Sequence, residues 1–191
     1  MHQILPYAGW RNAYRAEADP QSPFYGGLFG APRNGEFHRM FDFVIHPEWE
    51  FIGCETLYIK HLYANYEEGL AIIEVMGEWN DALNNDIMHF KRNVVDPMLQ
   101  EGIQKFLIIG DNLLNYHADA NDYYAEWSEE VEEGWIVGLN FRPQVVQDLQ
   151  TYGLSSYWWT GERFEYGAWR ASEPLKLGQM VDEQVNRHLG L

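Results

Sequence analysis

The sequence predicts an α/β protein with a mixed sheet, in which a β-hairpin is followed by the order β-α-β-α-β-α-β. Between residues 70 and 160, short strand-like runs alternate with segments whose apolar residues recur at helical spacing. Each segment between two such runs is long enough for a right-handed crossover, so the strands that it joins are expected to be parallel. The chain is 46% apolar and 16% aromatic, which is enough for a sizeable core and argues against disorder.

The first third of the chain predicts an arm, a short strand and a hairpin. Residues 1–35 are rich in Gly, Pro and aromatic residues without a regular period, so we expect them to cover the domain or a second subunit. A strand over 41–45 follows. Strands over 56–66 and 70–78 form the hairpin, because Gly69 stands where a tight turn requires a positive φ.

The hairpin leads into a helix and a buried strand. The helix begins near Asp81, with Asn80 or Asp81 as its N-cap, and Pro97 kinks or ends it. The apolar face of this helix comprises Leu83, Ile87, Phe90 and Val94. The run over 105–109 is almost continuously apolar and ends at Gly110, which is typical of a strand covered on both faces.

The pattern then repeats. A second helix follows Asp119 as its N-cap, and a strand covers 135–141. A third helix has Pro143 as its first residue and ends at Gly153, and a last short strand covers 156–160. The apolar positions of these two helices are Ala120, Tyr123, Tyr124, Trp127 and Val131, and then Val145, Val146 and Leu149.

The remaining residues divide into an irregular stretch or further hairpin up to residue 177 and a C-terminal helix. The apolar residues of that helix are Met180, Val181, Val185 and Leu189. The predicted organisation is an arm over 1–35, an α/β domain over 36–177 with five to seven strands, and a helix over 178–191 packed on the same domain.

Charge and composition narrow the function and the compartment. The formal net charge is −16, which argues against nucleic-acid binding and against docking on anionic lipid. No secretory signal or apolar run of about 20 residues is present, so we expect a cytoplasmic protein. Cys54 has no partner for an intrachain disulfide, and a lone cysteine in a strand-rich stretch is more typical of a small buried apolar residue than of a nucleophile.

A family resemblance covers approximately residues 56–160. It is carried by Leu70-Ala71-Ile72-Ile73-Glu74-Val75-Met76-Gly77-Glu78, the helix from Asp81, and Lys105-Phe106-Leu107-Ile108-Ile109. This arrangement resembles the STAS domain, also called the SpoIIAA-like fold. The resemblance implies a non-catalytic interaction or small-ligand module. Members of that family carry a phosphorylatable Ser or Thr in the loop after the second strand, whereas the predicted loop over 110–119 has neither.

Few residues point to catalysis. The sequence lacks a Gly-x-Ser-x-Gly elbow and both common glycine-rich nucleotide loops, so we predict no catalytic residue and no cofactor, and enzyme activity stays an open alternative. The segment from His117 to Asp122 has one imidazole and two carboxylates, which could together hold a divalent ion. Helix capping by Asp119 and the helix dipole at Asp122 explain those acids without a metal, so we predict no metal site.

The candidate site lies beyond the carboxyl ends of the parallel strands, where open α/β sheets bind ligands. The candidate ligand- or partner-binding residues are Asp111, Asn112, Asn115, His117, Arg142, Trp158 and Trp159. Arg142 could hold an anion at the start of a helix, or it could pair with Asp111 or Asp81. Trp158 and Trp159 are adjacent on a strand, so one is expected in the core and the other under later residues, the arm or a second subunit.

A run of acids forms a candidate surface apart from the strand-end site. Glu126, Glu129, Glu130 and Glu133 share one predicted helix face, which is either a docking surface for a basic partner or an ordinary solvated face.

The function favoured by these features is a non-enzymatic regulatory or protein-interaction module that binds a protein partner or forms a homodimer. The alternative is a small-ligand-binding domain that uses the strand-end crevice and the Trp/Tyr cluster. A cavity of ~300 Å³ or more at the strand ends would favour the alternative.

Overall fold

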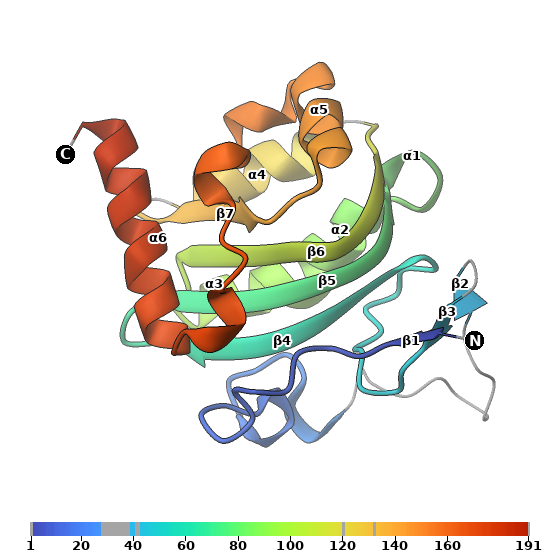
Figure 1. The fold of residues 1–191 in the computed structure, drawn as a ribbon, viewed down its shortest axis with the longest axis vertical. Coiled ribbons are helices and arrows are strands. Elements are labelled where there is room, and N and C mark those ends of the chain that lie inside the picture. Colours follow the sequence, from blue (N-terminus) through green and yellow to red (C-terminus); the bar gives the residue numbers. More distant parts are fainter. Residues whose placement is uncertain (1, 28–38, 41–42, 120, 132, 191) are drawn as a thin grey trace.

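The structure is a computed structural model that describes residues 2–27, 39–40, 43–119, 121–131 and 133–190. Its main sheet has four strands in the order β4-β5-β6-β7, with helices on both faces (Figure 1). The protein is therefore α/β with a mixed sheet, as the sequence predicts. The strands are β1 (His2–Ile4), β2 (Arg39–Met40), β3 (Phe43–Ile45), β4 (Leu57–Asn65), β5 (Leu70–Asn80), β6 (Lys105–His117) and β7 (Trp135–Leu139). The α-helices are α1 (Asp81–Asn84), α2 (Asp86–Phe90), α3 (Asp96–Gln100), α4 (Asp122–Glu130), α5 (Pro143–Thr151) and α6 (Pro174–Leu189).

The predicted hairpin and the two parallel pairings are confirmed. β4 pairs with β5 antiparallel, and β5–β6 and β6–β7 are both parallel. Gly69 has a φ of 63° in the turn between β4 and β5. A Cβ at Gly69 would also lie 3.1 Å from the carbonyl oxygen of Gly102, so both backbone conformation and space favour glycine there.

β6 is longer than predicted, and the expected loop over 110–119 is wrong. The strand has 13 residues and stays paired with β5 as far as the Asn80–His117 pair. Leu113 and Tyr116 are buried, while Leu114 and Asn115 between them are half-buried. The sequence pattern ends at Gly110 because the first half of β6 is apolar on both faces, whereas the second half mixes buried and half-buried residues without a regular alternation.

The first predicted helix is divided into three parts. Asn80 caps α1 by accepting a hydrogen bond from the Leu83 N–H at 3.0 Å, but Leu83 itself is 82% exposed. Asn85, in the left-handed conformation, separates α1 from α2, which brings the next apolar positions onto the sheet. Pro97 does not end the helix: a π-helical turn over 91–95 precedes it, and Pro97 lies in the first turn of α3.

Four later expectations are corrected. α4 begins after Asn121, so Asp119 is not its N-cap. The predicted strand over 156–160 forms a single parallel bridge between Trp159 and Val137, so the main sheet has four strands among the described residues and not five to seven. α6 begins at Pro174 and not at residue 178. β3 belongs to a separate small sheet with the order β1-β3-β2, and residues 41–42 lie outside the described residues.

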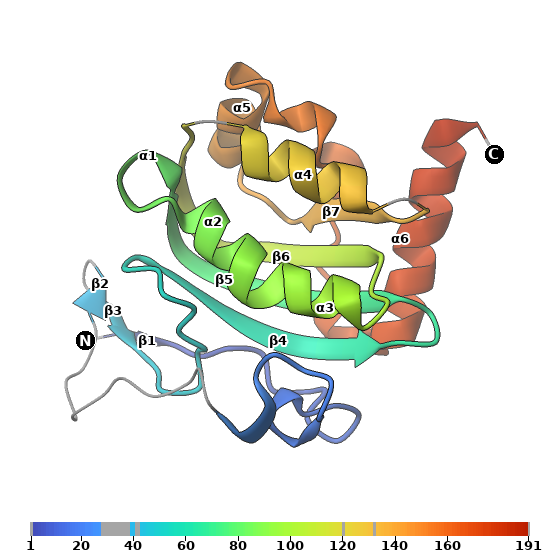
Figure 2. The same ribbon diagram turned by 180° about the vertical axis from the view of Figure 1, so that it is seen from behind.

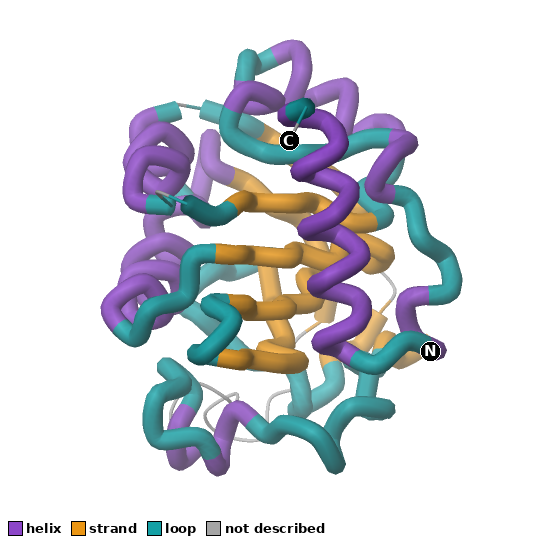
Figure 3. Tube along the Cα trace, turned by 90° about the vertical axis from the view of Figure 1, so that its left-hand side faces the viewer, coloured by secondary structure: helices purple, strands orange, loops and turns teal. Residues whose placement is uncertain are grey.

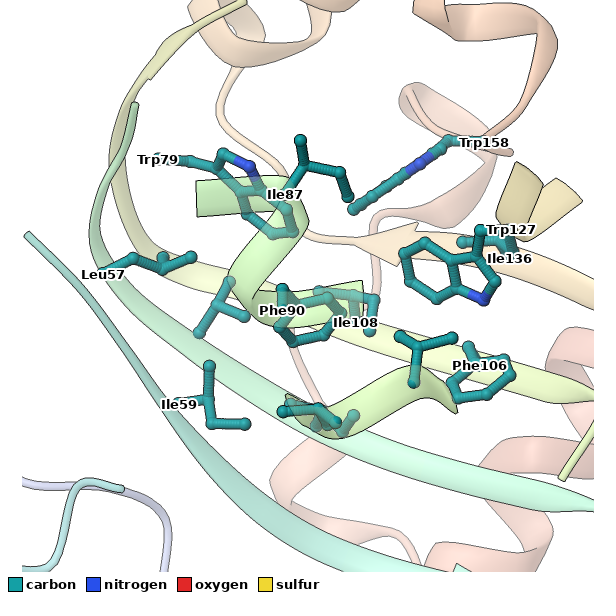
Figure 4. Packing of buried hydrophobic residues seen from close by; sticks show 14 of the residues in the cluster. Leu57, Ile59, Trp79, Ile87, Phe90, Phe106, Ile108, Trp127, Ile136 and Trp158 are labelled. Atoms are coloured by element: carbon teal, nitrogen blue, oxygen red, sulfur yellow. The ribbon is translucent and has the colours of Figure 1, made fainter. Parts of the chain in front are cut away.

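The sheet has two apolar faces with different covers. One face packs against α2, α3, α4 and α5, and the other packs against α6 and the start of the chain (Figure 2, Figure 3). Figure 4 shows the first of these cores, where Trp79, Phe90, Trp127 and Trp158 lie between the strands and the helices. Pro143 as the first residue of α5 and Gly153, with a φ of 73° after that helix, are confirmed. Every helix of the described residues is too short or too polar to cross a membrane.

Candidate functional site

The seven residues predicted for the strand-end site do not come together. Asp111 and Asn112 lie beside Glu74 on the α6 face, whereas Asn115 and His117 reach Glu78 at 3.3 and 2.9 Å. Arg142 is exposed and forms no ion pair with any described residue, so its predicted pairing with Asp111 or Asp81 is wrong. Asp111 instead forms its ion pair with Arg170.

The carboxylate of Glu74 joins three parts of the chain. It is fully buried and accepts hydrogen bonds from the Tyr7 backbone N–H at 2.8 Å and from Asn112 at 3.1 Å, with Arg170 at 3.5 Å. Asp111 accepts from the Trp169 indole at 2.9 Å and from Arg170 at 2.6 Å. Burial raises the pKa of Glu74 to about 7, against the opposing effects of the Tyr7 N–H and Arg170. Since these acceptors are filled within the protein, the cluster is a structural junction.

The strand-end crevice is small and acidic. A cavity of about 260 Å³ lies between α1–α2 and the start of α4, and Asp81, Asp119 and Asp122 line it. Asp81 is 4% exposed and accepts hydrogen bonds from Trp79, Ile87, Tyr116 and Tyr124. The volume of this crevice is below the ~300 Å³ typical of ligand pockets. The Asp81 carboxylate at the crevice already accepts hydrogen bonds from four donors.

Two acids of α4 are paired with cations of the neighbouring helical turn. Among the described residues, the one group of carboxylates close enough to share an ion is Asp96, Glu126 and Glu130. The ammonium group of Lys91, whose side chain is 0% exposed, already lies among these three carboxylates. Glu126 also pairs with Arg92 at 2.6 Å. The predicted acidic face is therefore partly neutralised by cations from the helix beside it.

The adjacent tryptophans lie on opposite faces of the sheet, as predicted. Trp158 is 3% exposed and packs in the core under α4, while Trp159 packs on the other face with its ring 4.8 Å from His188 of α6. Both residues, with Tyr157, line a cavity of about 380 Å³ beside the edge of β7. The indole Nε1 of Trp158 is buried without a hydrogen-bond partner among the described residues.

A larger cavity, of about 570 Å³, lies between the arm and the outer edge of β4. We define the arm by its described residues, 2–27, and call this space the arm cavity. Tyr7 and Trp10 pack with the α6 face, whereas Ala16 and Phe24 pack with the opposite face, so the arm crosses the edge of the sheet. The arm cavity lies along this crossing, with residues 47–50 as a further wall.

Glu50 closes the exposed edge of β4. Its backbone exchanges hydrogen bonds of 2.7 and 3.2 Å with Ile59. Its carboxylate accepts from the His61 backbone N–H at 2.7 Å and from the Lys60 ammonium at 2.6 Å. Burial raises the pKa of Glu50 to about 7, although Lys60 acts in the opposite direction. These contacts satisfy the edge at Ile59 and at the His61 N–H, in the middle of β4.

His61, like Glu50, is a buried polar residue that lines the arm cavity. The residue is 2% exposed, and its Nδ1 lies 3.4 Å from the Tyr14 hydroxyl and 3.3 Å from the Ser22 hydroxyl. Its Nε2 is buried without a partner among the described residues. Burial lowers the pKa of His61 to about 3, against the opposing effects of Asp19 and of a hydrogen bond between the ring and the Tyr63 backbone, so the ring is neutral at pH 7. Unpartnered buried polar atoms are rare enough to require an explanation.

The arm cavity has little catalytic potential. Ser22 and His61 are within reach of each other, but the imidazole has no third group at Nε2 to orient it, and a pKa of about 3 makes it a weak base. Cys54 is fully buried, and burial raises the pKa of its thiol, as expected of an apolar structural cysteine. The arrangement is suited to binding.

Sequence reasoning missed the arm cavity. His61 has no spacing signal, because it stands within a strand pattern and its neighbours in space come from residues 14–24. The unexplained aromatic content of the arm was the available signal. A scan against protein-family models finds no match for this chain, and a search of curated proteins finds none either.

Proposed function

We propose that this protein is a non-enzymatic binding module for a small molecule and that the arm cavity holds the ligand. The observation that carries the proposal is a cavity of about 570 Å³ between the arm and the outer edge of β4, with the buried residues Glu50 and His61 among those that line it. Ligand pockets typically have ~300–1,000 Å³, aromatic walls and a few convergent polar groups. Tyr7, Trp10, Tyr14 and Phe24 supply the aromatic walls.

We further propose that the protein is related to the STAS domain, and the fold is compatible with this relationship. A hairpin followed by two parallel crossovers supports the resemblance over residues 56–160, although the strand expected at 156–160 is reduced to one bridge. The site proposed here differs from the strand-end crevice expected from sequence. Binding of a protein partner, a homodimer and a cytoplasmic location stay predictions.

A pair of neighbouring substitutions tests the proposal. Asn12 is exposed and lines the arm cavity, whereas Ala13 is exposed and does not line it. A fragment library is screened by ligand-observed NMR against the wild type, Asn12→Trp and Ala13→Trp. We expect fragments that bind the wild type and Ala13→Trp but not Asn12→Trp, because an indole at position 12 fills the cavity. If no fragment follows this pattern, the arm cavity is not a ligand site.

A further inference from the structure

A second cavity lies at the opposite edge of the main sheet from the arm cavity. The strand order β4-β5-β6-β7 makes β7 the other edge strand, and a cavity of about 380 Å³ lies beside its first residues. We call this space the edge cavity. Its lining comes from the end of α4, the start of β7 and residues 155–159, and every lining residue that the structure describes is uncharged. Ser155 and Ser156 are exposed, so the cavity opens to solvent on that side.

The outer edge of β7 is paired at one position of a parallel ladder. The Trp159 N–H donates to the Ile136 carbonyl, and the Trp159 carbonyl accepts from the Gly138 N–H, both at 2.9 Å. These two bonds place Trp159 opposite Val137. In a strand, the N–H and the C=O of one residue point to the same neighbouring strand. The Ile136 N–H therefore points away from β6, as its carbonyl does.

The ladder stops before its next position, where Tyr157 would lie opposite Trp135. Tyr157 instead has a near-helical backbone, with φ −101° and ψ −22°, and its N–H donates to the Leu154 carbonyl at 3.0 Å. The Ile136 N–H and the Gly134 carbonyl, which a residue opposite Trp135 would pair, have no partner among the described residues. Ile136 is 3% exposed, and buried backbone groups without a partner are rare.

This open position presents one donor and one acceptor to the edge cavity. The Trp135 N–H donates to the Gln104 carbonyl at 3.1 Å on the β6 side, so the Gly134 carbonyl of the same peptide group points outward with the Ile136 N–H. Gly134 and Ile136 both line the edge cavity. The N–H and the C=O of one extended residue match this pair, as when a peptide adds to the edge of a sheet. One residue fits into the ladder, because Trp159 holds the next position.

We propose that the edge cavity binds one uncharged, extended residue of a peptide segment from a partner protein. The N–H of that residue donates to the Gly134 carbonyl, and its carbonyl accepts from the Ile136 N–H. The absence of charge is assigned from the lining, because a charged side chain would lose water there without gaining an ion pair from the described lining residues. An apolar side chain is assigned from the half-buried rings of Tyr157 and Trp159.

Three compounds built on leucine test the absence of charge. At about pH 6.5, N-acetyl-leucine methylamide is neutral, N-acetyl-leucine is an anion and leucine methylamide is a cation. Each compound is titrated into ¹⁵N-labelled protein. We expect the neutral compound to bind with a dissociation constant on the order of 1 mM, and at least ~5-fold more tightly than either charged compound. A preference of less than ~5-fold overturns the assignment of an uncharged residue.

A methylated compound and one backbone amide test the hydrogen bonds. N-acetyl-N-methyl-leucine methylamide lacks the donor to Gly134, so we expect it to bind at least ~5-fold more weakly, and a smaller loss overturns this bond. The bound neutral compound is also expected to move the Ile136 amide proton downfield. The Gly138 amide proton, which already donates to Trp159 on the same edge, is the control and is expected to stay in place. An Ile136 resonance that is unshifted at saturation overturns the proposal.

Matched substitutions at exposed positions test the location. Ser155 lines the edge cavity, whereas Gln150 on α5 does not. We expect Ser155→Trp to abolish binding of the neutral compound, and Gln150→Trp and Asn12→Trp to retain it. Binding that survives Ser155→Trp overturns the site.

Two further outcomes have separate consequences. Dimerisation of the wild type that Ser155→Trp abolishes overturns a partner protein as the occupant, because a second copy of the chain then holds the open position. If no compound binds, the proposal for the edge cavity is overturned as a whole. The proposed function of the arm cavity is unaffected by that result, because the arm cavity lies at β4, on the other edge of the sheet.

Discussion

Removing the buried carboxylate of Glu74 is expected to change how stability depends on pH. The carboxyl group has a pKa of about 7 in the folded protein, against 4.5 for an exposed glutamate. The folded state therefore binds more protons between these values, and the free energy of unfolding falls as pH rises through the window. For one group with these two values, the fall between pH 5 and pH 8 is about 2–3 kcal/mol. Glu74→Gln removes this contribution, because its amide does not titrate.

The assay is urea denaturation of the wild type and Glu74→Gln at pH 5 and pH 8. We expect the stability difference between the two proteins to move by about 2–3 kcal/mol in favour of the variant at pH 8. Comparing the proteins at each pH removes the contributions of other groups, including His61, whose lowered pKa makes stability fall as pH decreases below about 6.5. Glu67→Gln, on the exposed turn after β4, controls for the loss of one charge. Parallel pH profiles of the wild type and Glu74→Gln would refute the assignment of a destabilising buried carboxylate.

Three further substitutions test the packing and the local contacts. Trp127→Ala is expected to lower the free energy of unfolding by ~3–5 kcal/mol, because Trp127 is 0% exposed, and near-wild-type stability in urea would mean that α4 is rotated. Asp111→Lys leaves the Trp169 indole and Arg170 without their acceptor, so we expect a loss of ~2–3 kcal/mol in chemical denaturation, and an unchanged midpoint would contradict the contacts. Asn80→Ala removes the cap of α1 and should lower the melting temperature by ~2–4 °C. Asn80→Ser can still cap the helix and should keep a melting temperature close to that of the wild type.

The sequence alone predicts the helices and strands that have one or two apolar faces. The runs over 70–78 and 105–109 are strands because nearly all of their side chains are buried, and the pattern records that directly. Asn112 and Asn115 lie in β6 because β5 continues beside them, and this depends on the register between two strands. Pairing partners are a property of the fold, so a single segment cannot report them.

The candidate site depends even more on long-range contacts. Asp111 contacts residues 169 and 170, which sequence reasoning left as irregular, and this explains why Arg142 was the wrong partner. Trp158 and Trp159 were placed correctly because strand geometry alone puts neighbours on opposite faces. His61 could not be identified as a site residue, because its neighbours in space belong to the arm. Ser22, which contacts its ring, lies 39 positions earlier in the sequence.

The contacts of Tyr7 and Trp10 have a consequence for the order in which the protein folds. Their side chains donate to Arg170 and Ser172, across 163 and 162 positions of sequence. Closing so long a loop is entropically unfavourable until the intervening sheet has formed and has brought residues 170 and 172 near the arm. The hairpin and the parallel crossovers are therefore expected to assemble first, and the first ten residues to join last. The arm cavity exists only after that final step, so a ligand held there would slow unfolding by retaining the segment that is first to leave.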